Sequence, residues 1–114
     1  MDSVQAQLEK LKKKYGRELP EKVSRMEAAL AALQSQPWQE EAATTAYRSV
    51  HSLAGSSGTY GYLEISTSAR AAEALLKRCL ESRAPLPENQ KSELADLIAQ
   101  IRNLAAASAR ELSP

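Results

Sequence analysis

The chain has 114 residues, enough for one domain with a single core and too few for two domains of ordinary size. Hydrophobic residues make up 43% and aromatic residues 4%, with no Phe, so we expect an aliphatic core. The formal net charge of +1 argues against a protein that binds nucleic acid by charge alone. The one cysteine, Cys79, excludes an internal disulfide and a cysteine zinc site.

The sequence shows neither a membrane span nor the apolar core of a signal peptide, so we expect a cytoplasmic protein that does not associate with membranes. The first segment, at about 3–16, has apolar residues at helical spacing and ends or loosens at Gly16. We expect it to form a short N-terminal helix that packs across one end of the fold or extends the next helix. The second segment begins near Pro20, a favourable residue in a first turn, and ends in the run 34–37.

The third segment runs from about 38 to 60, and Gly61 is typical of the left-handed residue that closes a helix. A fourth segment follows at about 63–81. The proline-containing stretch 82–87 is the clearest loop, and a fifth segment then reaches about Arg110.

None of these segments shows the alternation of a strand. The pattern predicts an all-α fold, an antiparallel up-down four-helix bundle with an additional short N-terminal helix. We expect a single domain over 1–114, with the bundle core at about 20–110.

The third segment contains the only histidine of the chain, His51. The expected core stripe of this segment consists of Ala46, Val50, Leu53, Ser57 and Tyr60. His51 lies about 100° around the helix from Val50, which places it on the flank or the outside.

Small residues follow on the face of His51, where Ala54, Gly55 and Gly58 lie one or two turns further on. Glycine inside a helix costs about 1 kcal/mol relative to alanine. A surface cleared to Ala and Gly predicts a bare patch at which another protein approaches the backbone closely. Two alternatives stay open: His51 is an ordinary surface residue, or the glycines serve tight packing between helices.

The run from His51 to Gly61, His-Ser-Leu-Ala-Gly-Ser-Ser-Gly-Thr-Tyr-Gly, resembles the signature of histidine phosphotransfer (HPt) domains. The resemblance implies that His51 is a phosphoacceptor, which takes a phosphoryl group from an aspartyl phosphate and passes it to another aspartate. A neutral imidazole is a competent nucleophile for this chemistry at cytosolic pH. By the same resemblance, Gly55 lets the partner approach, whereas Ala54 stands where many members carry a lysine.

Other charged residues are expected near the histidine. Arg48 lies one turn before His51, and counting back from the turn places residue 71 opposite it on the neighbouring helix. Our hypothesis is that Glu73 accepts a hydrogen bond from one imidazole nitrogen and fixes the tautomer, while Lys77 or Arg48 faces the phosphoryl oxygens. The alternative is an ordinary solvated ion pair between Glu73 and Lys77.

These features predict a phosphotransfer module rather than an enzyme, because the chain has no carboxylate cluster to hold magnesium. The expected partners are a receiver domain, which would supply the aspartate and the magnesium, and a hybrid sensor kinase. We expect a monomer that binds no nucleic acid.

Three alternatives compete with this prediction. In the first, the chain is an HPt-like docking module that is never phosphorylated, which the missing lysine favours. The dimerisation domain of a histidine kinase would need a charged, proline-containing box after the histidine. A nucleic-acid binder would depend on the basic run at 10–17, which flanking glutamates make typical of a solvated face.

Overall fold

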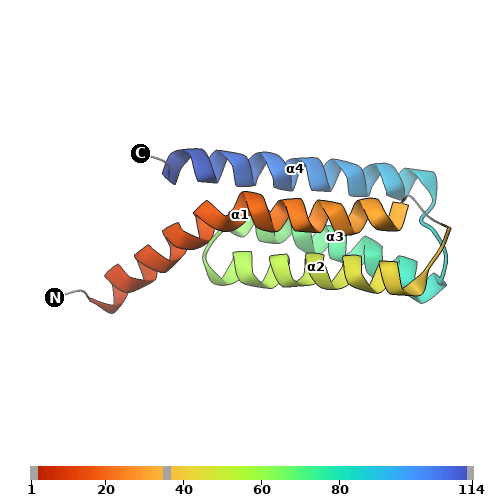
Figure 1. Ribbon diagram of the computed structural model, residues 1–114, viewed down its shortest axis with the longest axis horizontal. Helices are drawn as coiled ribbons and strands as arrows, with labels where there is room; N and C mark the ends of the chain where they lie inside the picture. The colour runs from red at the N-terminus through yellow and green to blue at the C-terminus, as the bar shows by residue number, and fades with distance from the viewer. Residues whose placement is uncertain (1–2, 35–36, 113–114) are drawn as a thin grey trace.

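The computed structural model describes residues 3–34 and 37–112. In these ranges the chain forms four helices and no strand: α1 (Val4–Gln34), α2 (Glu40–Thr59), α3 (Leu63–Ser82) and α4 (Glu88–Leu112). Figure 1 shows them side by side along one axis as a bundle, with short connections at its ends. The prediction of an all-α four-helix bundle is therefore confirmed. Of the turn predicted at 34–37, positions 35 and 36 lie outside the described residues.

The additional short N-terminal helix does not exist as a separate element, and that part of the prediction is wrong. The segment is the first half of α1, so of the two placements considered it is the extension that occurs. Gly16 does not end the helix. It is buried, and a Cβ at this position would collide with the Tyr62 hydroxyl and the Leu112 side chain, so a larger residue here would have to displace both side chains.

Pro20 explains the shape of α1, because it lies inside this 31-residue helix. A proline has no N–H to donate to the carbonyl four residues earlier, here that of Gly16, and its ring presses against that carbonyl. Helices usually kink at such a residue. Figure 1 shows the result: α1 bends, and its N-terminal end leaves the bundle.

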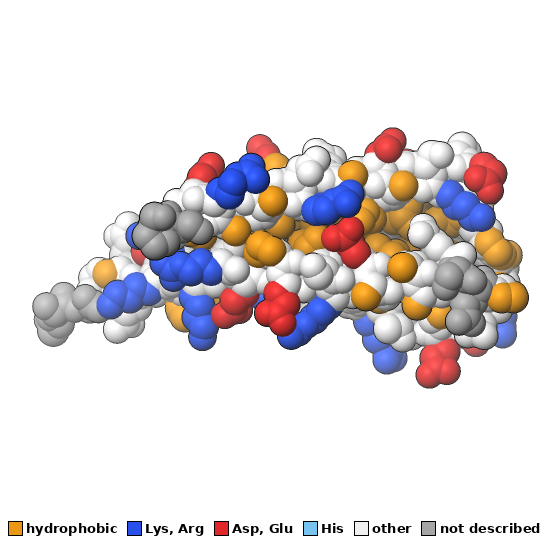
Figure 2. Space-filling model, turned by 45° about the horizontal axis from the view of Figure 1, so that its top comes forward, with side chains coloured by type: hydrophobic (Ala, Val, Ile, Leu, Met, Phe, Trp, Pro, Cys, Tyr) orange, Lys and Arg blue, Asp and Glu red, His pale blue; other side chains and the backbone are white. Residues whose placement is uncertain are grey.

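The core is aliphatic, as the composition indicates. The largest fully buried side chains are Leu19, Val23, Met26, Val50, Ser57, Leu76 and Ile101. Figure 2 shows apolar side chains also gathered along the seam between α1 and α4, where a shallow groove is lined in part by Leu30, Leu94 and Ile98.

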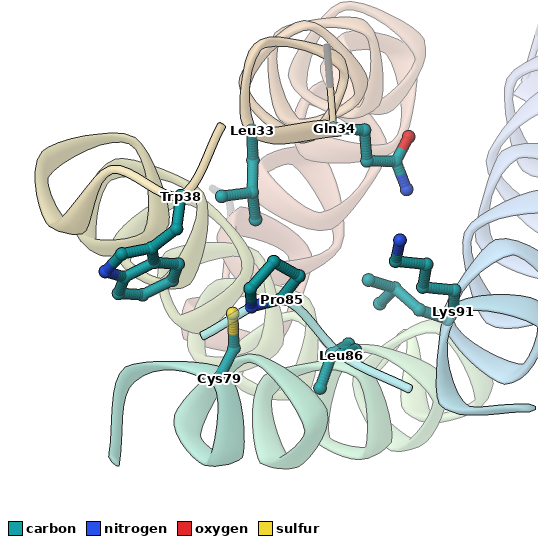
Figure 3. Close-up of a pocket in the computed structure, with 8 residues that line it drawn as sticks. Leu33, Gln34, Trp38, Cys79, Pro85, Leu86 and Lys91 are labelled. Carbon is teal, nitrogen blue, oxygen red and sulfur yellow. The ribbon is translucent and has the colours of Figure 1, made fainter. Parts of the chain in front are cut away.

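A pocket of about 210 Å³ lies at the end of the bundle where α1 and α3 finish and α4 begins (Figure 3). Trp38, Cys79, Pro85 and Leu86 line it. The Cys79 thiol is buried and donates a hydrogen bond to the Ala84 carbonyl at 3.1 Å. Cys79 therefore belongs to the packed end of the bundle.

Candidate functional site

The side chain of His51 is on the solvent-exposed side of α2. Its side chain is 67% exposed, while Val50, Leu53 and Ser57 on the opposite face of α2 are buried. Its Nδ1 atom is in hydrogen-bond contact with Oε2 of Glu73, a residue of α3 whose side chain is only 17% exposed. The structure thus brings together the histidine and the glutamate that the sequence pairs.

Tyr47 adds a contact to which sequence reasoning gave no role. Its ring stacks on the imidazole of His51, with ring centroids 5.9 Å apart and an interplanar angle of 16°. Helical spacing could have indicated this contact, because Tyr47 and His51 are four residues apart and such residues are neighbours on a helix. Tyr47 and Glu73 together hold the imidazole in one orientation. Nε2, the other ring nitrogen of His51, makes no hydrogen bond within residues 3–34 and 37–112.

The three small residues after His51 occupy three different environments. Gly55 is exposed, and a Cβ added there would meet nothing within 4 Å. Ala54 is only 1% exposed, so the prediction that it lines the open patch is wrong. Gly58 is half-buried and faces α3, where an added Cβ would lie 3.0 Å from the Ser66 hydroxyl. The packing alternative therefore holds for Gly58, and Gly55 alone has unfilled space beside it.

A hydrogen bond from α3 to α2, and another within α2, meet at one carbonyl where the two helices pack closely. The Ala54 carbonyl accepts hydrogen bonds from the Ser66 hydroxyl at 2.8 Å and from the Ser57 hydroxyl at 3.3 Å. Both serines are buried. Each hydroxyl is thereby satisfied without water, which removes the penalty of burying it and lets the two backbones approach each other.

The predicted cations lie near the site without joining it. Arg48 and Lys77 are both exposed. In the described part of the chain, neither forms a hydrogen bond or ion pair with His51 or Glu73. The predicted alternative, an ion pair between Glu73 and Lys77, is likewise not formed there.

Gly61 closes α2 as the sequence predicts. Its φ of +85° lies in the left-handed region, which a glycine adopts without strain. The N–H of Gly61 bonds to the Gly58 carbonyl at 3.1 Å, and the N–H of Tyr62 bonds to the Ser57 carbonyl at 2.8 Å. These bonds satisfy the last carbonyls of the helix. Because the turn is this short, α3 starts at once and runs back beside α2, which brings Glu73 level with His51.

Two further properties concern only the residues that the structure describes. Within 3–34 and 37–112, no three or more His, Cys, Asp or Glu side chains gather as a metal site would require. No helix in these ranges combines the length and the apolar character needed to cross a membrane.

The fold and the site define an all-α bundle domain that presents a single exposed histidine, held by a carboxylate from the adjacent helix. The family model of the Hpt domain matches residues 4–105, and the chain belongs to this family. Hpt domains are phosphocarrier modules of phosphorelays rather than catalysts, and they interact with receiver domains and kinases of two-component systems. Searches of curated proteins and of solved structures gave no match.

Proposed function

We propose that His51 is the phosphoacceptor of this Hpt domain, and that it relays a phosphoryl group between the aspartates of two receiver domains. The observation that carries the proposal is the state of the ring: the side chain is 67% exposed, and Nδ1 is already engaged by Glu73. A partner can therefore reach the ring, and the nitrogen left to react is Nε2.

Phosphoryl transfer to His51 is a displacement at phosphorus. The Nε2 lone pair of His51 attacks the phosphorus of a receiver aspartyl phosphate, an N–P bond forms, and the P–O bond to the aspartate breaks with release of its carboxylate. The imidazole keeps its proton on Nδ1, where the N–H donates to the Glu73 carboxylate. The positive charge that the ring gains on phosphorylation is then stabilised by the negative charge of Glu73. Transfer to the next aspartate is the reverse of this step.

The phosphoryl oxygens need positive charge, and this chain has Ala54 where the related signature often has a lysine. We propose that Arg48, one turn before His51, or Lys77, one turn beyond Glu73, supplies it. Both are exposed long side chains without an ion-pair partner in the described part of the chain, so each is able to turn toward the phosphoryl group.

The remaining requirements of phosphoryl transfer fall to the partner. A receiver domain would bring the reacting aspartate and a magnesium ion to neutralise the transferred group. Gly55 supports close docking, since the space above it is open. On this proposal the protein is a cytoplasmic, monomeric carrier and not an enzyme, and a hybrid sensor kinase is a second candidate partner.

The test is transfer from an isolated receiver domain carrying ³²P-labelled aspartyl phosphate. The wild-type protein should gain a base-stable, acid-labile label, and His51→Gln should gain none. Lys91→Gln, at an exposed lysine of α4 outside the proposed site, serves as a matched surface control and must accept label at the wild-type rate. If the wild-type protein binds cognate receivers yet takes up no label from any of them, the chain is a docking module and the phosphoacceptor role is wrong.

A further inference from the structure

The N-terminal part of α1 carries a row of exposed aliphatic side chains. Val4, Leu8 and Leu11 are 73%, 58% and 47% exposed, and among the described residues the only other large hydrophobic residue this exposed is Leu63. This row lies on the N-terminal end of α1, which leaves the bundle in Figure 1. We call residues 4–14 the stalk.

The apolar row of the stalk is uncovered because α1 reaches beyond the helices that pack beside it. Its 31 residues span about 46 Å, whereas the 20 residues of α2 span about 30 Å. The end of the bundle is marked by Tyr62, whose hydroxyl donates to the Lys12 carbonyl at 2.8 Å. Beyond that contact, no other described helix continues alongside α1, and the apolar face has nothing to cover it.

The spacing of the exposed residues indicates what would cover them. Val4, Leu8, Leu11 and Tyr15 follow one another at intervals of four, three and four, which is the a/d stripe of a heptad repeat. This stripe meets the core at Tyr15, which is buried. A stripe of two positions in seven is narrow and suits a neighbouring helix. Helices that lie in a membrane surface carry a wider apolar face, often with Trp or Phe, and the stalk has neither.

The charges beside the stripe indicate the character of that helix. The e and g positions that flank Leu8 and Leu11 hold Gln5, Gln7, Lys12 and Lys14. Lys10 and Lys13 add positive charge, and Glu9 is the one acidic residue of the stalk. Figure 2 shows Lys and Arg side chains on this tapering end of the molecule. A second copy of the chain would place a second set of lysines beside those of the stalk, and the like charges would repel. An acidic helix would instead complement them.

We propose that the stalk is a docking site for an acidic amphipathic helix of a partner protein, with aliphatic residues at a and d and Glu or Asp at e and g. This site is separate from the proposed phosphotransfer site. Lys12, at the bundle end of the stalk, lies close to Gly61. Gly61 is ten residues from His51, or about 15 Å along the axis of α2.

The test uses the full chain and a synthetic 21-residue helical peptide with Leu at a and d and Glu at e and g. A matched peptide carries Lys in place of Glu. We expect the acidic peptide to bind, more weakly as salt rises, and the basic peptide to bind at least tenfold more weakly. The double variant Leu8→Ser, Leu11→Ser should lose at least tenfold in affinity with an unchanged melting temperature. Leu63→Ser, an exposed leucine outside the stalk, should bind as the wild type does.

Several outcomes would overturn the proposal: no binding of the acidic peptide, equal binding of both peptides, or full affinity in the double variant. If the wild type sediments as a dimer and the double variant as a monomer, the apolar stripe of the stalk binds a second copy of the chain instead. Binding to phosphatidylglycerol vesicles without binding to the acidic peptide would assign it to a membrane surface. Phosphoryl uptake by the double variant is measured in parallel, so that failure of this proposal and failure of the His51 assignment are distinguishable.

Discussion

Glu73 reaches His51 from the adjacent helix, placing its Oε2 atom against Nδ1 across the α2–α3 interface although the two residues are 22 positions apart in the chain. The carboxylate is mostly covered and the imidazole mostly exposed, at 17% and 67% of their side-chain surface. A shielded acceptor orients an accessible ring better than a solvated one, because water competes less for its hydrogen bond. The pair is thus arranged to present Nε2 outward in one protonation pattern.

Replacing Glu73 by Ala should slow phosphoryl uptake roughly 10- to 100-fold, since a hydrogen bond to a charged group contributes about 1.5–3 kcal/mol. The uptake rate of Glu73→Gln should lie between those of the wild type and Glu73→Ala, because the amide oxygen still accepts from Nδ1 but carries no charge. The imidazole ¹⁵N shifts of the wild type should report the Nδ1–H tautomer. Uptake by Glu73→Ala at the wild-type rate would rule out this role.

Gly55 and Gly58 should respond to alanine in opposite ways. Gly55→Ala should raise the free energy of unfolding by about 0.5–1 kcal/mol, because alanine favours the helix and the new Cβ meets nothing within 4 Å. At Gly58 the new Cβ lies 3.0 Å from the Ser66 hydroxyl, which is tied to the Ala54 carbonyl. Gly58→Ala should therefore give no gain or a loss, and adding Ser66→Ala should relieve part of it. Urea unfolding of the variants checks both expectations.

A larger residue at Gly55 separates docking from folding. Gly55→Gln should leave the bundle at least as stable as the wild type, since the position is exposed and glutamine is a good helix former. It should nevertheless raise the dissociation constant for a receiver domain at least tenfold, because the side chain stands where the partner would approach. Isothermal titration measures the affinity, and an unchanged value would mean that the partner does not use this surface.

Tyr47 should matter through its ring and not through its hydroxyl. Tyr47→Ala removes the stack on His51 and should slow phosphoryl uptake about two- to tenfold, as expected for an interaction of about 0.5–1.5 kcal/mol. Tyr47→Phe keeps the ring and should retain the wild-type rate. If the two variants lose the same amount of activity, the stack is not what positions the imidazole.

Burial raises the pKa of the Cys79 thiol, which should make it slow to react. Only the thiolate attacks alkylating reagents, so at pH 8 iodoacetamide should label the native protein at least tenfold more slowly than the urea-unfolded protein. Since the pKa is higher in the folded state, this group contributes stability that is present below its unfolded pKa and is lost as the pH rises above it. The labelling rate should increase with pH and fall when the bundle is made more stable.

Periodicity along the chain predicted the helices, the bundle, the exposure of His51 and the turn at Gly61. Counting residues back from that turn also placed Glu73 near the histidine. The error at Ala54 arose from taking the core stripe of α2 as too narrow, because this residue lies four positions after Val50 and packs with it in the core. The contact between Gly58 and Ser66 depends on the distance between α2 and α3. The spacing of residues along one helix does not predict that distance.

The sequence pattern left two placements open for the segment at about 3–16, and the structure shows that it extends the next helix. Gly16 indicated the end or loosening of one segment, and Pro20 indicated the first turn of the next. The helix continues through both residues, where Tyr15, Gly16 and Leu19 are buried and the Tyr62 hydroxyl bonds to the Lys12 carbonyl. Tertiary packing here overrides local preference.

The continuity of α1 through this bend has a thermodynamic consequence for the stalk. A segment of eleven residues is too short to hold a helical form in water by itself, because forming the first turn is unfavourable. Joined to a buried helix, it needs no nucleation step and only has to propagate turns that the bundle has already started. A partner helix would thus meet a preformed template and would bear little of the ordering entropy that a disordered segment imposes on binding.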